Sequence, residues 1–293
     1  MSRARKFYLE NAAGERMDLN GEARIYLVDP TGLGITVARS YADLGNGFFT
    51  PITSQSMPQQ QPGGTLVFTG SQPYADYRRF INWTMSSQDL VLVYLSYGSV
   101  EYYRKIDVNY MSKGELTRVG WLEVPVSFAT RTPWYRAKPT KLTITNTKNK
   151  EHRYPYRYTS DLIYGGSSGS TFSAAINSGG HVPAALELQY SGSILNPRIT
   201  LRGEISGDIY GICQINASIS TRETLEFSTL VQNSYVRKRS ASGEITDLLH
   251  TVDLSYEPFF KIPITEPSVL EMEADTSLSG VATLQVYYYF GSV

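Results

Sequence analysis

The sequence contains a single cysteine, Cys213, and only three histidines among its 293 residues. One cysteine excludes an internal disulfide and a cysteine-rich zinc site, and it predicts a small buried core residue. The histidines have no cysteine or carboxylate at metal-ligand spacing, so they indicate neither a metal site nor a catalytic triad. A paired-carboxylate site for cell-wall hydrolysis is not recognisable either. We therefore expect no catalytic residues, no metal and no cofactor.

Long apolar runs and net charge are also lacking. No window approaches the roughly 20 apolar residues of a membrane helix, and the basic N-terminus lacks the apolar region of a signal peptide. Residues 1–138 carry 15 basic and 12 acidic side chains (15 − 12 = +3), and residues 139–293 carry 12 and 15 (12 − 15 = −3). Neither part is basic enough to bind nucleic acid electrostatically. We expect a soluble protein made in a cytoplasm.

The glycine-rich stretch at residues 165–170, GGSSGS, resembles a phosphate-binding loop only superficially. It has neither the lysine nor the strand-to-helix setting that phosphate binding requires. The stretch therefore predicts a flexible loop.

Tyrosine is abundant, with 22 residues against 11 Phe and 3 Trp. Tyrosine suits half-buried strands and protein interfaces, where its hydroxyl group stays hydrated. All three tryptophans precede residue 135. The second half of the chain therefore has no tryptophan.

The stretch at residues 101–135 organises the first half. Residues 121–128 alternate between apolar and other side chains, which predicts a strand with one buried face. Pro125 lacks an N–H group and so predicts a sheet edge or a bulge on one side of that strand. The strand leads to a Pro-Trp-Tyr sequence that we expect to act as an anchor. The interface or anchor candidates are Tyr102, Tyr103, Trp121, Glu123, Trp134 and Tyr135.

Other patterns in the first half predict a β-rich domain with one helix. Residues 7–10 and 17–19 predict a hairpin, and residues 90–95 predict a central strand paired with residues 101–108. A helix is expected after Ser71, its predicted N-cap, with Pro73 in its first turn. Residues 51–64 are polar and proline-rich, which predicts an extended loop or arm without fixed secondary structure.

The composition changes near residues 136–139, so we predict domains at 1–138 and 139–293. The second half shows short strand patterns separated by turn signals and no helical pattern, which is typical of an antiparallel β-sandwich. The expected strands are 141–146, 171–176, 184–190, 198–203, 209–215, 224–228, 248–254 and 281–290.

An ordered set of short motifs carries a family likeness over nearly the whole chain. The motifs are Asn11 to Gly14, the Pro30-Thr31-Gly32-Leu33-Gly34 loop, the Tyr74, Tyr77 and Phe80 helix, Tyr102-Tyr103-Arg104, Glu115-Leu116-Thr117 with Gly120-Trp121-Leu122-Glu123, Pro133-Trp134-Tyr135, Tyr154-Pro155-Tyr156-Arg157-Tyr158, Asn196-Pro197, and Pro263 after Phe259-Phe260. With these motifs the chain resembles the distal tail proteins (Dit) of long-tailed phages, the siphovirus-type tail components.

The resemblance implies a structural virion protein of the tail tip or baseplate. It implies an N-terminal domain that closes into a hexameric ring and a C-terminal galectin-like β-sandwich. Such a ring joins the tail tube to the tail tip, and DNA passes through it without specific binding. The implied partners are further copies of the chain, the tail tube protein, the tape-measure protein, a tail-tip or tail-associated protein, and a receptor-binding protein.

An alternative function is receptor or carbohydrate binding by the C-terminal sandwich. Asn196 and Arg198 lie in an Asn-Pro-Arg run like the galactose-binding run of galectins. Ile194 stands at the position of the galectin histidine, and no tryptophan is available to stack on a sugar. We therefore interpret Asn196 primarily as a turn residue and keep both residues as weak sugar-site candidates.

Overall fold

The computed structural model describes residues 5–52, 56–87, 89–96, 100–136, 140–142, 145–148, 170–177, 179–276, 278 and 280–293. The chain forms two compact units. Unit 1 comprises Met1–Ala137 and Tyr289–Val293, and unit 2 comprises Lys138–Tyr288. The sequence-based division assigned all of residues 139–293 to the second domain, whereas the last five residues lie in unit 1.

Unit 1 is built on an antiparallel sheet in the order β2-β1-β7-β8-β9-β6-β3. The bounds are β1 (Lys6–Glu10), β2 (Arg16–Asp18), β3 (Ile25–Thr31), β6 (Gly63–Phe68), β7 (Leu90–Leu95), β8 (Glu101–Met111) and β9 (Leu122–Thr130). The N–H of Leu19 donates to the Phe7 carbonyl (3.1 Å), and the N–H of Leu27 donates to the Leu19 carbonyl (2.9 Å). Leu19 therefore bridges β1 and β3, and the sheet curls back on itself.

Several predictions for this sheet are confirmed: the β1–β2 hairpin, the β7–β8 pair and the alternating burial of β9. Strand β9 is not at a sheet edge, because it pairs with both β6 and β8. Its β8 ladder ends at the Met111–Val126 pair, immediately before Pro125. Pro125 thus lies one residue beyond the last pair of this ladder, where its carbonyl still accepts from the Ser112 N–H (3.1 Å) and its missing N–H breaks the regular pairing.

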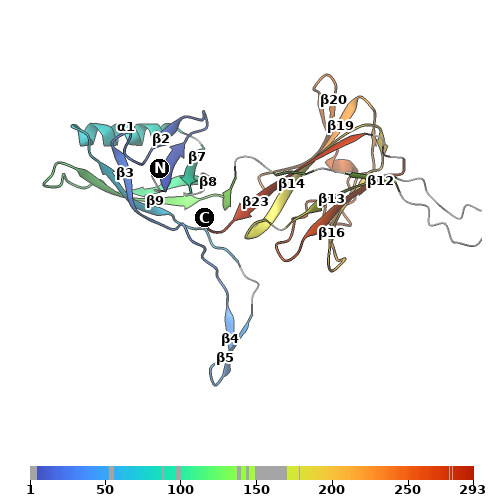
Figure 1. Cartoon of the computed structure of the whole chain (residues 1–293), viewed down its shortest axis with the longest axis horizontal. Coiled ribbons are helices and arrows are strands. Elements are labelled where there is room, and N and C mark those ends of the chain that lie inside the picture. Colours follow the sequence, from blue (N-terminus) through green and yellow to red (C-terminus); the bar gives the residue numbers. More distant parts are fainter. Residues whose placement is uncertain are drawn as a thin grey trace, which may run out of the picture. The chain divides into compact units, whose positions relative to one another are not determined.

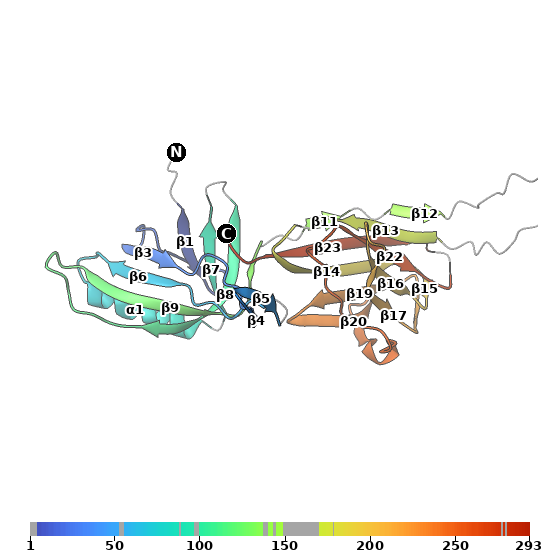
Figure 2. The same cartoon turned by 90° about the horizontal axis from the view of Figure 1, so that it is seen from below.

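The predicted helix is α1 (Pro73–Ser86), which lies across one face of this sheet (Figures 1 and 2). Phe80 is fully buried and packs edge-on against Phe68 of β6, with 5.8 Å between ring centroids. The N-cap is Gln72, without a side-chain cap, so the assignment of Ser71 as the cap was wrong. Pro73 at the first helical position fixes the helix start instead, since its φ is already helical.

A hairpin of β4 (Tyr41–Gly45) and β5 (Phe48–Pro51) projects from unit 1 (Figure 1). The sequence placed the arm at residues 51–64 instead. Gln60 and Pro62 are buried, and the Gln60 backbone is hydrogen-bonded to the Thr130 side chain. The described residues between β5 and β6 form no helix or strand, as predicted, but the end of this stretch is packed into unit 1 and does not project as an arm.

Unit 2 contains two antiparallel sheets, in the orders β11-β23-β14-β19-β20-β21 and β12-β13-β22-β16-β17, and a short β15–β18 pair. The first sheet is formed by β11 (Thr140–Leu142), β14 (Val182–Ser191), β19 (Glu223–Leu230), β20 (Asn233–Ser240), β21 (Ile245–Asp247) and β23 (Val281–Phe290). The others are β12 (Thr145–Lys148), β13 (Ser170–Ile176), β15 (Ile194–Leu195), β16 (Arg198–Gly203), β17 (Ile209–Gln214), β18 (Ser218–Ile219) and β22 (Ser268–Glu273). One apolar core unites side chains from both main sheets.

The chain is mainly β with one α-helix among the described residues, as expected. The predicted strand at residues 248–254 is wrong, because the 3-10 helix η1 (Leu249–Thr251) occupies its centre. Strands β20 and β22 were missed. Strand β10 (Trp134–Tyr135) pairs with the end of β23, Trp134 opposite Phe290, and this pairing keeps the last residues in unit 1.

Candidate functional site

The β4–β5 hairpin, here called the arm (residues 41–52), carries the largest concentration of exposed apolar side chains in unit 1. Leu44, Phe48, Phe49 and Ile52 are each about two-thirds exposed, at 66%, 69%, 63% and 65%. Its turn has positive φ at Gly45, Asn46 and Gly47, which glycine and asparagine tolerate best. This projecting hairpin precedes the polar stretch at residues 51–64 and is apolar. Apolar patches of this kind on soluble proteins mark interaction surfaces.

A second exposed apolar surface lies in and beside the connection between β8 and β9. Tyr110, Leu116, Val119 and Trp121 are exposed there. Trp121 is 45% exposed, and Glu123 on the solvent face of β9 is also exposed. Both of these interface candidates are therefore open to a partner.

The other four candidates lie where β8, β10 and the end of β23 meet. Trp134 is fully buried, and Tyr103 is buried and stacks on Tyr135 with 6.0 Å between ring centroids. Tyr102 is half-buried and meets Phe290 edge-on at 5.4 Å. These residues pack against one another within unit 1, and Trp134 is fully buried, so its ring is not an exposed contact surface.

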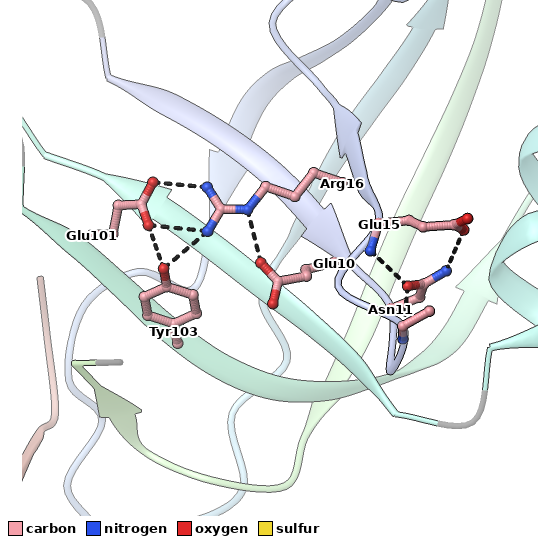
Figure 3. Close-up of polar contacts among 7 residues, drawn as sticks. Glu10, Asn11, Glu15, Arg16, Glu101 and Tyr103 are labelled. Atoms are coloured by element: carbon pink, nitrogen blue, oxygen red, sulfur yellow. Dashed lines mark hydrogen bonds and ion pairs between the residues drawn. The ribbon is translucent and has the colours of Figure 1, made fainter. Parts of the chain in front are cut away.

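Arg16 of β2 organises a polar cluster that the sequence did not reveal (Figure 3). Its Nε donates to Glu10 (2.7 Å), and its Nη1 and Nη2 donate to the two carboxylate oxygens of Glu101 (2.8 and 3.1 Å). Nη2 also donates to the Tyr103 hydroxyl (2.9 Å), and that hydroxyl donates to Glu101. Arg16 thus ties β2 to β8 across the sheet. Only the pairing order β2-β1-β7-β8 brings these residues together, so no local signal could have found them.

The electrostatics of this cluster are those of a structural clamp. The hydrogen bond from Arg16 lowers the pKa of Glu101, and the bond from Tyr103 adds to it. Burial raises the pKa of Tyr103, and burial raises that of Tyr135 to about 12. Glu101 therefore stays ionised and Tyr103 and Tyr135 stay neutral at neutral pH, so none of these three groups is poised for proton transfer.

The Asn11 to Gly14 turn beside this clamp explains one motif of the family likeness (Figure 3). Asn11 Oδ1 accepts hydrogen bonds from the N–H groups of Ala13 (3.0 Å) and Glu15 (2.9 Å). Gly14 has φ of +79°, which favours glycine at that position. The motif therefore forms the turn that positions Arg16 beside Glu10 and Glu101.

In unit 2, the weak sugar-site candidates lie at the start of β16. Asn196 has φ of +50°, and its Nδ2 donates to Asp275 (2.7 Å), so it is engaged as a turn residue. The Arg198 guanidinium lies 5.8 Å from the ring centroid of Tyr256, which is 42% exposed. Sequence reasoning missed Tyr256, because it is distant in sequence from Arg198.

No cluster of three or more metal-ligating side chains occurs within the described ranges. Within the same ranges, no helix is both long and apolar enough to cross a membrane. The glycine-rich stretch at 165–169 lies outside the residues that the structure describes.

Comparisons with known proteins agree with this architecture. The family described as "Distal tail protein, N-terminal domain" matches residues 6–131. No curated protein matches the chain.

Two solved structures share the fold over almost the whole chain. A chain of the phage P2 baseplate in its activated conformation with Ca has 16% identity and a TM-score of 0.60, with 99% of this chain and 100% of that chain covered. The Dit (gp 19.1) protein of phage SPP1, described as a hub of the adsorption apparatus in phages that infect Gram-positive bacteria, has 11% identity and a TM-score of 0.60, with 96% and 98% covered.

Proposed function

The N-terminal domain of this chain belongs to the distal tail protein family, and from this premise we propose that the chain is a structural subunit of a phage tail tip or baseplate. The family is structural rather than enzymatic. Two solved structures of the same fold, from the phage P2 baseplate and from SPP1, support a position of this chain in the virion. The protein is made in the cytoplasm of the bacterial host and acts in the assembled tail.

We infer further that copies of the chain close into a hexameric ring between the tail tube and the tail tip, and that DNA passes through this ring. The observation that carries the inference is the arm, whose large apolar side chains are uncovered in the single chain. A ring requires that one surface of each subunit meets a different surface of its neighbour. A projecting apolar hairpin provides such a surface.

The proposed partners follow from this position. The tail tube protein and the tape-measure protein lie on one side of the ring. A tail-tip or tail-associated protein, and with it a receptor-binding protein, lies on the other. The exposed surface around Trp121 and Glu123 is available for one of these contacts.

The test is a pair of matched variants. Phe48→Asp combined with Phe49→Asp places charge on the arm, and Leu254→Asp places charge on an apolar residue of unit 2 that is 73% exposed. Native mass measurement and sedimentation should show a hexamer for the wild type and for Leu254→Asp, and smaller species for the arm variant. A wild-type chain that stays monomeric at high concentration, also with tail partners present, contradicts the ring.

A second candidate function is carbohydrate binding by unit 2. The exposed Tyr256 beside Arg198 is the observation in its favour, because an aromatic face next to a polar side chain suits a sugar. Saturable binding of a cell-wall glycan that is lost in Arg198→Ala and in Tyr256→Ala would establish it. Binding that both variants retain would place the glycan site elsewhere.

A further inference from the structure

Unit 1 contains a concentration of buried polar atoms without hydrogen-bond partners. Among the described residues these atoms are Gln60 Nε2 and Oε1, Arg104 Nη1 and Trp134 Nε1, together with Ser268 Oγ in unit 2. Native proteins leave few such atoms unsatisfied, because each one has lost its water without replacement. Four of the five belong to three residues of unit 1.

These three residues are connected through one segment. The guanidinium of Arg104 lies over the Trp134 ring, 5.2 Å from its centroid, and its Nε donates to the Thr132 carbonyl (3.0 Å). The hydroxyl of Thr130 accepts from the Gln60 N–H (3.1 Å) and donates to the Gln60 carbonyl (3.0 Å). Residues 130–134 therefore contact the side chain of Arg104 and the backbone of Gln60, and they include Trp134, whose ring lies beside the Arg104 guanidinium.

Arg104 also brings an uncompensated charge. It is 2% exposed, and it forms an ion pair with no carboxylate of the described residues. Burial lowers its pKa to about 10, so the guanidinium stays protonated at neutral pH. A buried cation normally requires an anion beside it, since stacking and one backbone hydrogen bond do not replace its hydration.

The unsatisfied atoms define the chemistry of the missing group. Three of them are donors, on Arg104, Trp134 and Gln60, and one is an acceptor. A bound water would satisfy a donor but would leave the charge uncompensated. We propose that Arg104 and Trp134, whose unsatisfied Nη1 and Nε1 atoms are both donors, form a binding site for one small carboxylate ion, held by the guanidinium of Arg104.

The proposal is tested by the thermal stability of unit 1 in formate and in chloride at equal ionic strength. A ligand that binds only the folded state raises the melting temperature as its concentration exceeds its Kd. The wild type should show a saturable rise that is specific for formate, about 5–10 °C at about 100 times Kd. Equal responses to formate and chloride overturn the proposal, because they indicate bound water or general salt effects only.

Two variants separate the site from surface effects. Arg104→Met removes the charge and should abolish the formate-specific rise. Arg136→Met is the matched control, because Arg136 also stacks on aromatic rings, Tyr102 and Phe290, but is exposed. It should keep the full formate response. A formate response that persists in Arg104→Met contradicts the site, and titration of the wild type by calorimetry gives the result even if that variant does not fold.

Discussion

Glu226 in unit 2 and Arg104 in unit 1 are both buried charged side chains, 4% and 2% exposed, but their surroundings differ. Glu226 accepts hydrogen bonds from Arg237 Nε (2.6 Å) and Arg239 Nε (2.7 Å) on the neighbouring strand β20. Burial alone raises the pKa of Glu226, but the bonds from Arg239 and Arg237 outweigh it and lower the pKa overall. Unit 2 thus supplies the countercharge for its buried ion, whereas the described part of unit 1 does not.

The two units also differ in how their exposed apolar side chains are distributed. In unit 1 the exposed apolar side chains are concentrated on a projecting hairpin and in the β8–β9 connection. In unit 2 exposed apolar residues such as Ile205, Val231 and Leu254 are distributed over separate loops. Scattered exposed apolar residues are ordinary, but concentrated ones mark contact surfaces. The concentration of exposed apolar side chains in unit 1 supports the proposal that unit 1 makes contacts with other molecules.

The largest expected effect is on unit 1. Trp134→Ala removes a fully buried indole ring and should lower the stability of unit 1 by about 3–5 kcal/mol. Calorimetry of the full chain should show a lower melting temperature for unit 1. Native mass measurement should show reduced ring assembly. Trp121→Ala, at a 45% exposed position, is the control and should change stability by no more than about 0.5 kcal/mol. Similar losses in both variants would contradict the anchor role of Trp134.

A smaller effect is expected in unit 2. Glu226→Gln leaves two arginines without their shared carboxylate and should cost roughly 1–3 kcal/mol. Its control on the same strand is Glu223→Gln, which loses one partly exposed ion pair with Lys238 (2.8 Å) and should cost less than about 1 kcal/mol. Denaturant unfolding measures both. Equal costs would show that the buried cluster is no more important than a surface pair.

The acid stability of unit 2 should depend on Glu266. Hydrogen bonds from Ser206 and Tyr210 lower the pKa of this carboxyl from 4.5 to about 2. A lowered pKa in the folded state stabilises the protein above pH 4.5, and this contribution is lost as the pH falls towards about 2. Melting curves between pH 6 and pH 2 should therefore be less pH-dependent in Glu266→Gln than in the wild type. An equal pH dependence in Glu266→Gln and in the wild type would contradict this role of Glu266.

The smallest expected signal is the reactivity of Cys213. The thiol is buried in unit 2, and burial raises its pKa to about 12, so it is almost entirely protonated at neutral pH. A thiol reagent should label native Cys213 only as fast as unit 2 opens. The labelling rate should be unchanged by Trp134→Ala and increased by Glu226→Gln. Faster labelling in Trp134→Ala would show that the two units unfold together.

Much of the strand content could be predicted because alternation is a local property. The alternating pattern of β9 and the continuous apolar run of β7 predicted their burial correctly. Strand β20, with the sequence NSYVRKRS, was missed because its charged face looks like a solvated loop. That face is explained only by Glu226 on the adjacent strand, a residue that the sequence alone does not place there.

The candidate site was less predictable. Six aromatic and acidic candidates were identified from residues 101–135. The polar cluster also contains Arg16 and Glu10, which are about 90 residues earlier in the sequence. The arm was expected at residues 51–64 because those residues are polar. The apolar hairpin lies earlier, and nothing in the sequence showed that its apolar side chains stay exposed.

The sequence by itself determined the mainly β class, the helix, the turns and the family likeness, since each depends on neighbouring residues and on steric rules of the backbone. Only the tertiary structure decided which side chains share an environment. Pairing of Trp134 with Phe290 returns the end of the chain to unit 1, and the curled sheet places Arg104 inside it. The physical reason is that burial and charge compensation depend on residues far apart in sequence, whose approach is fixed only when the sheets form.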